Sequence, residues 1–285
     1  MVKIVSDSTC DLTPELAARY DLTIVPLHIL LGDAEYRDGE NITQADIFKW
    51  ADTHKTTPKT SAVSIEDTMA AFKPILDAGN EIIAFHISES MSTTGNMMRM
   101  AAQELDAEDR ITVVNSENLT TCVGHLAIEA SIMAAAGMDR ASILEEIHRL
   151  IPRLRASFVV DTLIYLYRGG RCNAVAALAG GMLRLHPRIF VENGAMDAGK
   201  KYRGKIGAVV RNYAKDMEAD LLKAKKERVF ITHSMQGADM KIVEETEAYL
   251  KSLGHFDEVL ITRTGGVVSS HCGPGTLGIL FIAGE

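Results

Sequence analysis

The strongest constraint on the fold is the alternation of short apolar segments with helical segments along the chain. Runs such as Lys3–Val5 and Thr23–Leu31 are typical of strands, and Thr13-Pro14-Glu15 is typical of a helix start because it joins an N-cap residue to a first-turn proline. This alternation predicts a parallel sheet covered by helices on both faces. In the same part of the chain we expect helices from Thr43 and Ser64, strands Glu81–Ile87 and Arg110–Val114, and helices Leu119–Gly137 and Ala141–Arg155.

A second part of the chain starts near residue 157, with Ser157-Phe158-Val159-Val160. A turn at Asn193-Gly194 predicts that two strands of this part form a hairpin. The other expected elements are helices Ala174–Leu185, Ala208–Lys225 and Asp239–Gly254, and strands Arg188–Glu192, Arg228–Thr232, Glu258–Thr262 and Gly278–Ala283. With 285 residues, the chain is long enough for two compact domains. We therefore predict two α/β domains: a mainly parallel sheet flanked by helices over residues 1–156, and a mixed sheet with helices over residues 157–285.

Charge and composition argue against several classes of function. The net charge is −8 and no basic stripe stands out, which disfavours binding to nucleic acid. No apolar run approaches the roughly 18 to 20 residues that cross a bilayer, and the first residues do not form a signal peptide. The four cysteines show no C-x-x-C spacing, so we expect free thiols and no metal site. These features predict a cytoplasmic protein without stable membrane insertion.

Four clusters of polar residues follow predicted strands, where open α/β sheets place their binding sites. Serines and threonines in such clusters serve more often as helix N-caps than as ligand contacts. His271 lies in a predicted loop between two strands, where it could donate a hydrogen bond to a carboxylate or phosphate or be a structural hydrogen-bonder. Ser234 follows a strand as a hydrolase nucleophile does, but Thr232 and Gln236 stand where that tight turn requires small residues.

Five segments, taken in order, resemble motifs of the DegV family of fatty-acid-binding proteins. Together they extend over essentially the whole chain. They are Ser6-Asp7-Ser8-Thr9-Cys10-Asp11-Leu12, Thr60-Ser61, Ile87–Thr94, Arg168-Gly169-Gly170-Arg171 with the later Pro187, and His271-Cys272-Gly273-Pro274-Gly275. The chain departs from the family pattern at Ala62-Val63, Glu89-Ser90 and Thr93, which replace Gln-Pro, Ser-Gly and Gly.

The resemblance implies a carrier that holds a long-chain fatty acid in a buried tunnel between two α/β domains. It further implies that the acid is presented to a separate ATP-binding subunit, a fatty acid kinase, which forms an acyl phosphate for bacterial phospholipid synthesis. No cofactor is implied. By position, the carboxylate-binding residues are Thr60, Ser92 and His271, the further pocket and loop residues are Ser61, Thr93, Thr94 and Gly273, and the residues that meet the kinase are Arg171 and Arg203.

Two other functions are open at this point. The first is a serine-dependent acyl hydrolase or transferase that uses Ser92 with His271 as its base, with Asp7 as a candidate third member. The second is a phosphotransfer component, because the N-terminal part is similar to the substrate domain of dihydroxyacetone kinase. The sequence contains no G-x-x-x-x-G-K-[ST] motif, so we do not expect the chain to bind ATP itself.

Overall fold

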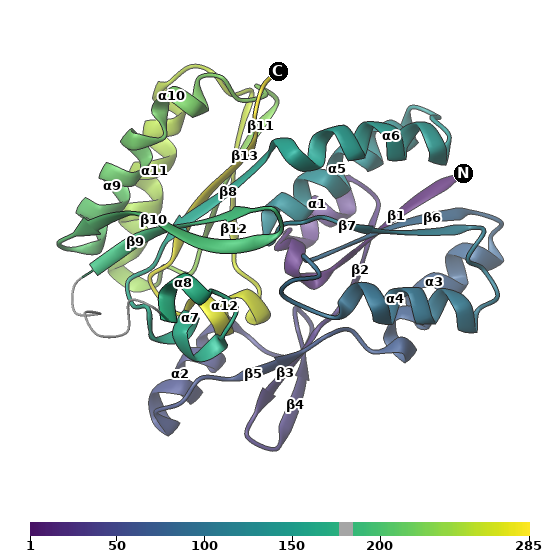
Figure 1. Cartoon of the computed structure of the whole chain (residues 1–285), viewed down its shortest axis with the longest axis horizontal. Helices are drawn as coiled ribbons and strands as arrows, with labels where there is room; N and C mark the ends of the chain where they lie inside the picture. The colour runs from purple at the N-terminus through teal and green to yellow at the C-terminus, as the bar shows by residue number, and fades with distance from the viewer. Residues whose placement is uncertain (177–184) are drawn as a thin grey trace.

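The computed structural model describes residues 1–176 and 185–285, and its first sheet is parallel throughout (Figure 1). Its strands lie in the order β2-β1-β6-β7. Alternate residues of β6 face opposite sides: Ile83 and Phe85 pack into one core cluster, Ile82 and Ala84 into another. Both faces are therefore buried, as predicted. The strands are β1 (Val2–Asp7), β2 (Leu22–Val25), β6 (Glu81–His86) and β7 (Ile111–Asn115).

Helices cover the two faces of this first sheet. The first two clearly show the caps that the sequence predicts: Thr13 accepts a hydrogen bond from the backbone of Leu16, and Thr43 forms a capping box with Asp46. The helices α5 and α6 belong to one core cluster, and α3 and α4 to the other. The helices that cover it are α1 (Pro14–Arg19), α3 (Ile65–Asp77), α4 (Thr94–Glu104), α5 (Thr121–Ala135) and α6 (Arg140–Leu150), whereas α2 (Gln44–His54) lies against α12 (Gly266–Cys272).

A small antiparallel sheet projects from this part of the molecule, in the order β4-β3-β5. The predicted extended segment Thr23–Leu31 is extended, but it divides at Pro26 into β2 and β3 (His28–Leu31), which belong to different sheets. The other strands are β4 (Ala34–Arg37) and β5 (Lys59–Ser61). In this sheet Ile29 is paired with Thr60, which fixes the position of Thr60.

The second large sheet is mixed, with the strand order β10-β9-β8-β13-β11-β12. The pair β11 and β12 is parallel and the other pairs are antiparallel, so the predicted fold class is confirmed. The strands are β8 (Leu154–Val159), β9 (Leu185–Glu192), β10 (Ala195–Arg203), β11 (Arg228–His233), β12 (Glu258–Arg263) and β13 (Leu277–Ile282). The helices are α7 (Ile164–Gly169), α8 (Asn173–Ala176), α9 (Ile206–Asp216), α10 (Glu218–Leu221), α11 (Met240–Ser252) and α12 (Gly266–Cys272).

Three predicted helices differ from the structure. The helix expected over Ala141–Arg155 ends at Leu150, because Pro152 lacks the N–H that would continue it, and β8 starts at Leu154. The helix expected over Ala208–Lys225 divides at Met217, whose side chain turns into the core beside Ser157. Of the helix expected over Ala174–Leu185, the structure describes α8; residues 177–184 lie outside the described residues, and Leu185 opens β9.

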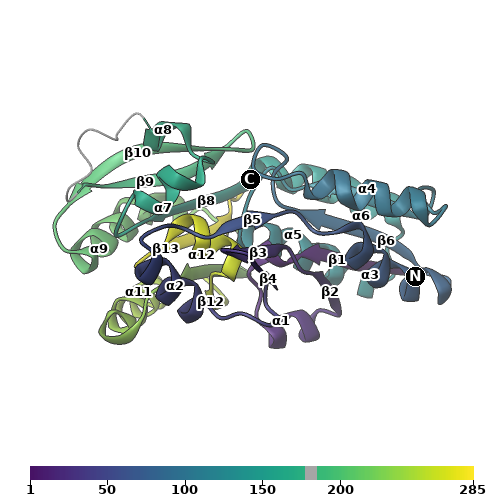
Figure 2. The ribbon, with the colours of Figure 1, turned by 90° about the horizontal axis from the view of Figure 1, so that it is seen from below.

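Both views show α12 near the middle of the molecule, beside α7 and β5 (Figures 1 and 2). The helix follows β12 and leads into β13, so both of its neighbours along the chain belong to the second sheet. Its packing partners also include α2, β3 and β5, which come from the N-terminal part. Residues on α12 therefore lie at the contact between the two parts. Within the described residues, no helix is long and apolar enough to cross a bilayer.

Candidate functional site

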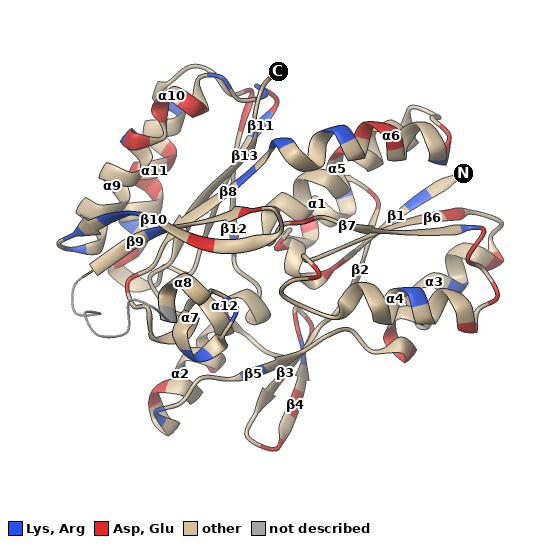
Figure 3. Cartoon of the chain, in the orientation of Figure 1, with Lys and Arg blue, Asp and Glu red and all other residues tan. Residues whose placement is uncertain are grey.

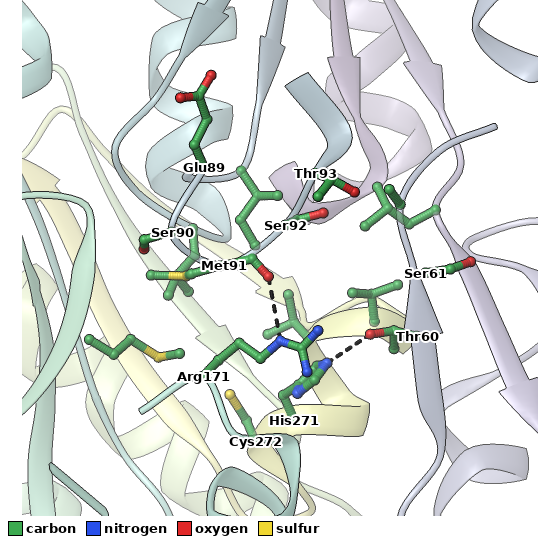
Figure 4. Close-up of a pocket in the computed structure, with 17 residues that line it drawn as sticks. Thr60, Ser61, Glu89, Ser90, Met91, Ser92, Thr93, Arg171, His271 and Cys272 are labelled. Carbon is green, nitrogen blue, oxygen red and sulfur yellow. Dashed lines mark hydrogen bonds between the residues drawn. The ribbon is translucent and has the colours of Figure 1, made fainter. Parts of the chain in front are cut away.

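A cavity of about 450 Å³ opens where α12, β5 and the loop after β6 meet (Figure 4). Its size falls within the roughly 300 to 1,000 Å³ that is usual for small-molecule sites. The apolar side chains that line it include Ile87, Met91, Leu119, Met196, Val268 and Cys272. The polar ones include Thr60, Glu89, Ser92, Thr93, Arg171 and His271. A largely apolar wall with a few grouped polar side chains suits an amphipathic ligand.

The centre of the polar group is a contact between His271 and Thr60. The imidazole Nε2 of His271 lies 2.8 Å from the hydroxyl oxygen of Thr60. The cap of the following helix is Ser64, whose hydroxyl accepts the backbone N–H of Asp67. Ser64 therefore caps the helix, and the hydroxyl of Thr60 contacts His271 at the cavity instead. The structure thus brings two residues of the predicted site together.

The prediction that His271 lies in a loop is wrong, because the structure places it in the last turn of α12. This helix contains glycine, valine and serine residues, which favour helix weakly. The carboxylates of Asp11 and Asp38 accept hydrogen bonds from the backbone N–H groups at its start. These caps come from distant parts of the chain, so local sequence patterns could not reveal them.

The ring of His271 fits against a glycine. A side-chain Cβ on Gly169 would lie 2.4 Å from the Nδ1 atom of His271, so the first glycine of Gly169-Gly170 makes room for the imidazole. The Nδ1 atom is buried and has no hydrogen-bond partner among the described residues. Burial, followed by the charge of Arg171, lowers the pKa of His271 to about 4. The ring is therefore neutral at pH 7, with one N–H to donate.

Arg171, which the resemblance suggests as a contact for the kinase, lies on the cavity wall. Its Nε donates to the carbonyl of Met91 at 3.4 Å and its Nη1 to the carbonyl of Gly169 at 2.7 Å. Figure 4 shows its guanidinium beside His271, on the side of the cavity that holds Thr60. Its positive charge would attract an anionic headgroup here. The preceding residue, Gly170, adopts a left-handed conformation, φ 65°, that turns the chain directly before Arg171.

The loop that carries Ser92 is held in place by a buried carboxylate. Asp7, at the end of β1, accepts the backbone N–H of Ile87 at 2.9 Å. Burial raises the pKa of Asp7 to about 6. Ser92 lines the cavity, and its hydroxyl pairs with that of Thr94 at 2.9 Å. Asp7 thus anchors the start of this loop and does not contact the His271 ring as a triad acid would.

Two departures from the family motifs make contacts of their own. The hydroxyls of Ser88 and Ser90 both donate to the carbonyl of Gly194, in the turn of the β9–β10 hairpin. Glu89 pairs with Arg99 of α4 at 2.7 Å. Since Met196 of the same hairpin lines the cavity, these contacts tie two of its walls together.

The remaining predicted residues divide into two groups. Ser61 and Thr93 line the cavity with Thr60, Ser92, His271 and Arg171. Outside its lining, Gly273 ends α12 and Arg203 lies exposed at the other end of β10 from Met196. Ser234, the candidate nucleophile that the sequence argued against, is buried and donates to the carbonyl of Gly273.

Comparisons with known proteins agree along the full length of the chain. A relative from Deinococcus radiodurans, a DegV domain-containing protein, is 32% identical over 98% of this chain and 97% of its own. A solved structure described as fatty acid binding of a DegV family protein from Thermus thermophilus is 30% identical, with a TM-score of 0.89 over 99% of each chain. A stearic acid-binding protein from Eubacterium ventriosum is 28% identical, with a TM-score of 0.84 over 99% of this chain and 98% of that one. The family model described as "Uncharacterised protein, DegV family" matches residues 1–284, and the chain belongs to the DegV family.

Proposed function

We propose that this chain is a carrier that binds a long-chain fatty acid, with the carboxylate at Thr60, Ser92 and His271. The observation that carries the proposal is the cavity itself, whose polar side chains gather around the His271–Thr60 contact while methionine, leucine and valine line the rest. The fatty acids bound by the related proteins from Thermus thermophilus and Eubacterium ventriosum support this ligand class.

The volume of the cavity suits the tail of such a ligand. Taking roughly 30 Å³ for a water-sized group such as a methylene, the cavity of about 450 Å³ holds roughly fifteen carbon atoms. Each buried methylene contributes about 0.8 kcal/mol, so the tail supplies on the order of 10 kcal/mol before the costs of ordering. This driving force requires a dry, apolar wall, which Met91, Leu119 and Met196 provide.

The headgroup needs hydrogen-bond donors, because a buried carboxylate without partners is very costly. Thr60 and Ser92 each offer a hydroxyl, and neutral His271 offers one N–H. The cation of Arg171 balances the charge from the same side of the cavity. Because the guanidinium of Arg171 is exposed to solvent, the anion is not held in a buried ion pair, which suits a carrier that must release its headgroup.

We further propose that the bound carboxylate is phosphorylated by a separate ATP-dependent kinase in the bacterial cytoplasm, for phospholipid synthesis. Arg171 is exposed to solvent beside the headgroup site, in the segment between α7 and α8. Arg203 ends β10, within a group of Lys and Arg residues along this strand (Figure 3). These two arginines are our candidates for contact with the kinase. The division into domains at residues 1–156 and 157–285 remains part of this proposal.

The contacts of Ser92 favour a carrier over an acyl hydrolase. A serine nucleophile needs a base within hydrogen-bond reach. The hydroxyl of Ser92 instead pairs with Thr94, and Nε2 of His271 pairs with Thr60. The carboxylate of Asp7, the candidate third member, is used by the backbone of Thr9 and Ile87.

Mass spectrometry of an organic extract from the purified protein tests the proposal. We expect about one fatty acid for each chain, and a large loss of it in the triple variant Thr60→Val, Ser92→Ala, His271→Ala. A protein that is purified empty, and that added hexadecanoic acid does not protect against thermal unfolding, would contradict the proposal. The extract of a bacterial protein of similar size prepared in parallel is the control for adventitious lipid.

A further inference from the structure

We infer that Asp11 and Asp38 are positioning residues that set His271 in place by capping the helix on which it lies. The inference rests on the proposed function, because its consequence is an effect on fatty acid binding. Neither carboxylate lines the cavity. Both belong to the N-terminal part of the chain, whereas α12 connects two strands of the second sheet.

The contacts lie at the first turn of α12. The Oδ1 atom of Asp11 accepts the backbone N–H of Gly265 at 2.7 Å. The Oδ1 atom of Asp38 accepts that of Gly266 at 2.6 Å, and its Oδ2 atom accepts that of Val267 at 3.4 Å. Backbone N–H groups at a helix start have no partner within the helix, so these carboxylates satisfy three successive donors.

The second side of each carboxylate is held by a hydroxyl of the N-terminal part. Thr120 donates to Asp11, and Ser8 donates to Asp38 at 3.0 Å. Asp11 is 5% exposed and Asp38 is 3% exposed, so both carboxylates are fixed in the interior. They therefore link the start of α12 rigidly to the N-terminal part, where Thr60 lies.

Two glycines fit this arrangement closely: Gly265 directly before the helix and Gly266 as its first residue. A Cβ on Gly265 would lie 3.0 Å from the Oδ1 atom of Asp11. A Cβ on Gly266 would lie 3.0 Å from the Oδ1 atom of Asp38 and 2.4 Å from the side chain of Ile29. At both positions a side chain would crowd the carboxylate that caps the helix.

The helix depends on these caps more than an ordinary helix does. It has seven residues, Gly-Val-Val-Ser-Ser-His-Cys, and short helices of this composition are not stable alone. His271 is its sixth residue, so a shift at the first turn moves the imidazole. A displacement of a few tenths of an ångström is enough to weaken its hydrogen bond to Thr60.

The test compares Asp38→Ala with Asp139→Ala, which removes the N-cap of α6, an exposed helix cap far from the cavity. Hexadecanoic acid binding is measured by titration calorimetry on delipidated protein. We expect Asp38→Ala to weaken binding about tenfold and Asp11→Ala to weaken it several-fold, from the loss of the hydrogen bonds to the first turn of α12. Asp139→Ala should bind as the wild type does, although it loses comparable helix stabilisation.

A double-mutant cycle separates positioning from a general loss of stability. In a His271→Ala background, Asp38→Ala should weaken binding less than twofold, because the residue through which it acts is gone. An undiminished tenfold effect in that background would overturn the inference. If Asp38→Ala does not fold, Asp38→Asn takes its place in the cycle, because it retains one acceptor for the backbone N–H of Gly266. We expect Asp38→Asn to weaken binding roughly threefold when His271 is present and to have no such effect in the His271→Ala background.

A second readout does not involve the fatty acid. In spectra of protein labelled at histidine, the ring resonances of His271 should shift in Asp38→Ala and stay in place in Asp139→Ala. If the wild type fails to bind hexadecanoic acid but the resonances shift, the proposed ligand is wrong and the positioning role stands. If the wild type binds and the resonances of His271 are unchanged in Asp38→Ala, the positioning role is wrong.

Discussion

His271 and Thr60 are separated by 211 residues, and yet Nε2 of the one lies 2.8 Å from Oγ1 of the other. Each side chain comes from a different part of the chain, Thr60 from the small sheet and His271 from α12. The contact therefore forms only when the two parts are correctly packed. Binding of a headgroup at this pair would therefore depend on that packing, and substitutions here test the proposed site directly.

Removing the hydroxyl of Thr60 should weaken fatty acid binding with little effect on the fold. Thr60→Val keeps the shape of the side chain and deletes one donor to the carboxylate. A hydrogen bond to a charged group contributes about 1.5 to 3 kcal/mol, so we expect a loss of affinity of at least tenfold in titration calorimetry. Thr53→Val is the matched control, because Thr53 is exposed on α2 and donates to the backbone of Lys49. Equal affinities for Thr60→Val and the wild type would contradict the assigned role.

The neutral state of His271 predicts a dependence of stability on pH. The pKa of His271 falls from an ordinary 6.5 to about 4, mainly through burial. A lowered histidine pKa gives stability that is complete above the unfolded value and is lost as the pH falls from about 6.5 towards 4. We expect the delipidated wild type to lose about 2 kcal/mol more than His271→Asn between pH 7 and pH 5, measured by urea unfolding.

The pH dependence that Asp7 contributes has the opposite sign. Burial raises the pKa of Asp7 to about 6, so its contribution to stability is lost as the pH rises through 6. It is present in both proteins and cancels from the comparison of the wild type with His271→Asn. If the wild type and His271→Asn lose the same stability between pH 7 and pH 5, the protonation of His271 is not coupled to folding.

A side chain at Gly169 should displace the imidazole of His271. The Cβ of Gly169→Ala would lie 2.4 Å from Nδ1, closer than any normal contact. We expect fatty acid affinity to fall at least tenfold. Gly207→Ala, in α9, meets its nearest atom at 3.5 Å and is the control. It should bind normally and gain about 0.5 to 1 kcal/mol of stability, as alanine does in a helix. Normal binding by Gly169→Ala would show that the ring position is unimportant.

Leu119 should limit the length of the tail. It lines the main cavity and, with Val268 and Cys272, also borders a second space of about 10 Å³ behind it. Leu119→Ala would join the two and shift the preference towards acids longer by roughly two carbons, at a cost of about 2 to 5 kcal/mol in stability. The preference is measured by competition between saturated acids of even length.

Leu166→Ala controls for the loss of stability in that experiment. Leu166 is 1% exposed and belongs to the same core cluster as Leu119, but it does not line the cavity. It should be destabilised to a similar extent with an unchanged preference for chain length. A shift of preference in both variants would mean that loosening of the core, and not the shape of the cavity, sets the selectivity.

Much of the fold could be predicted from the sequence because its signals are local. The caps at Thr13, Thr43 and Ser64 and the turn at Asn193-Gly194 each depend on residues within a few positions. The helix under His271 could not be predicted, since its caps are 254 and 228 residues away. The resemblance suggests Arg171 only as a contact for the kinase. Its place on the cavity wall depends in part on a hydrogen bond to the carbonyl of Met91, 80 residues away, which only the folded chain brings close.

The crystal structure of this protein with hexadecanoic acid tests the central claim most directly. We predict that the carboxylate lies within hydrogen-bond distance of the hydroxyls of Thr60 and Ser92 and of Nε2 of His271, with the tail along Met91, Leu119 and Met196. A tail that enters in the reverse direction, or a carboxylate that lies in solvent away from His271, would contradict the account.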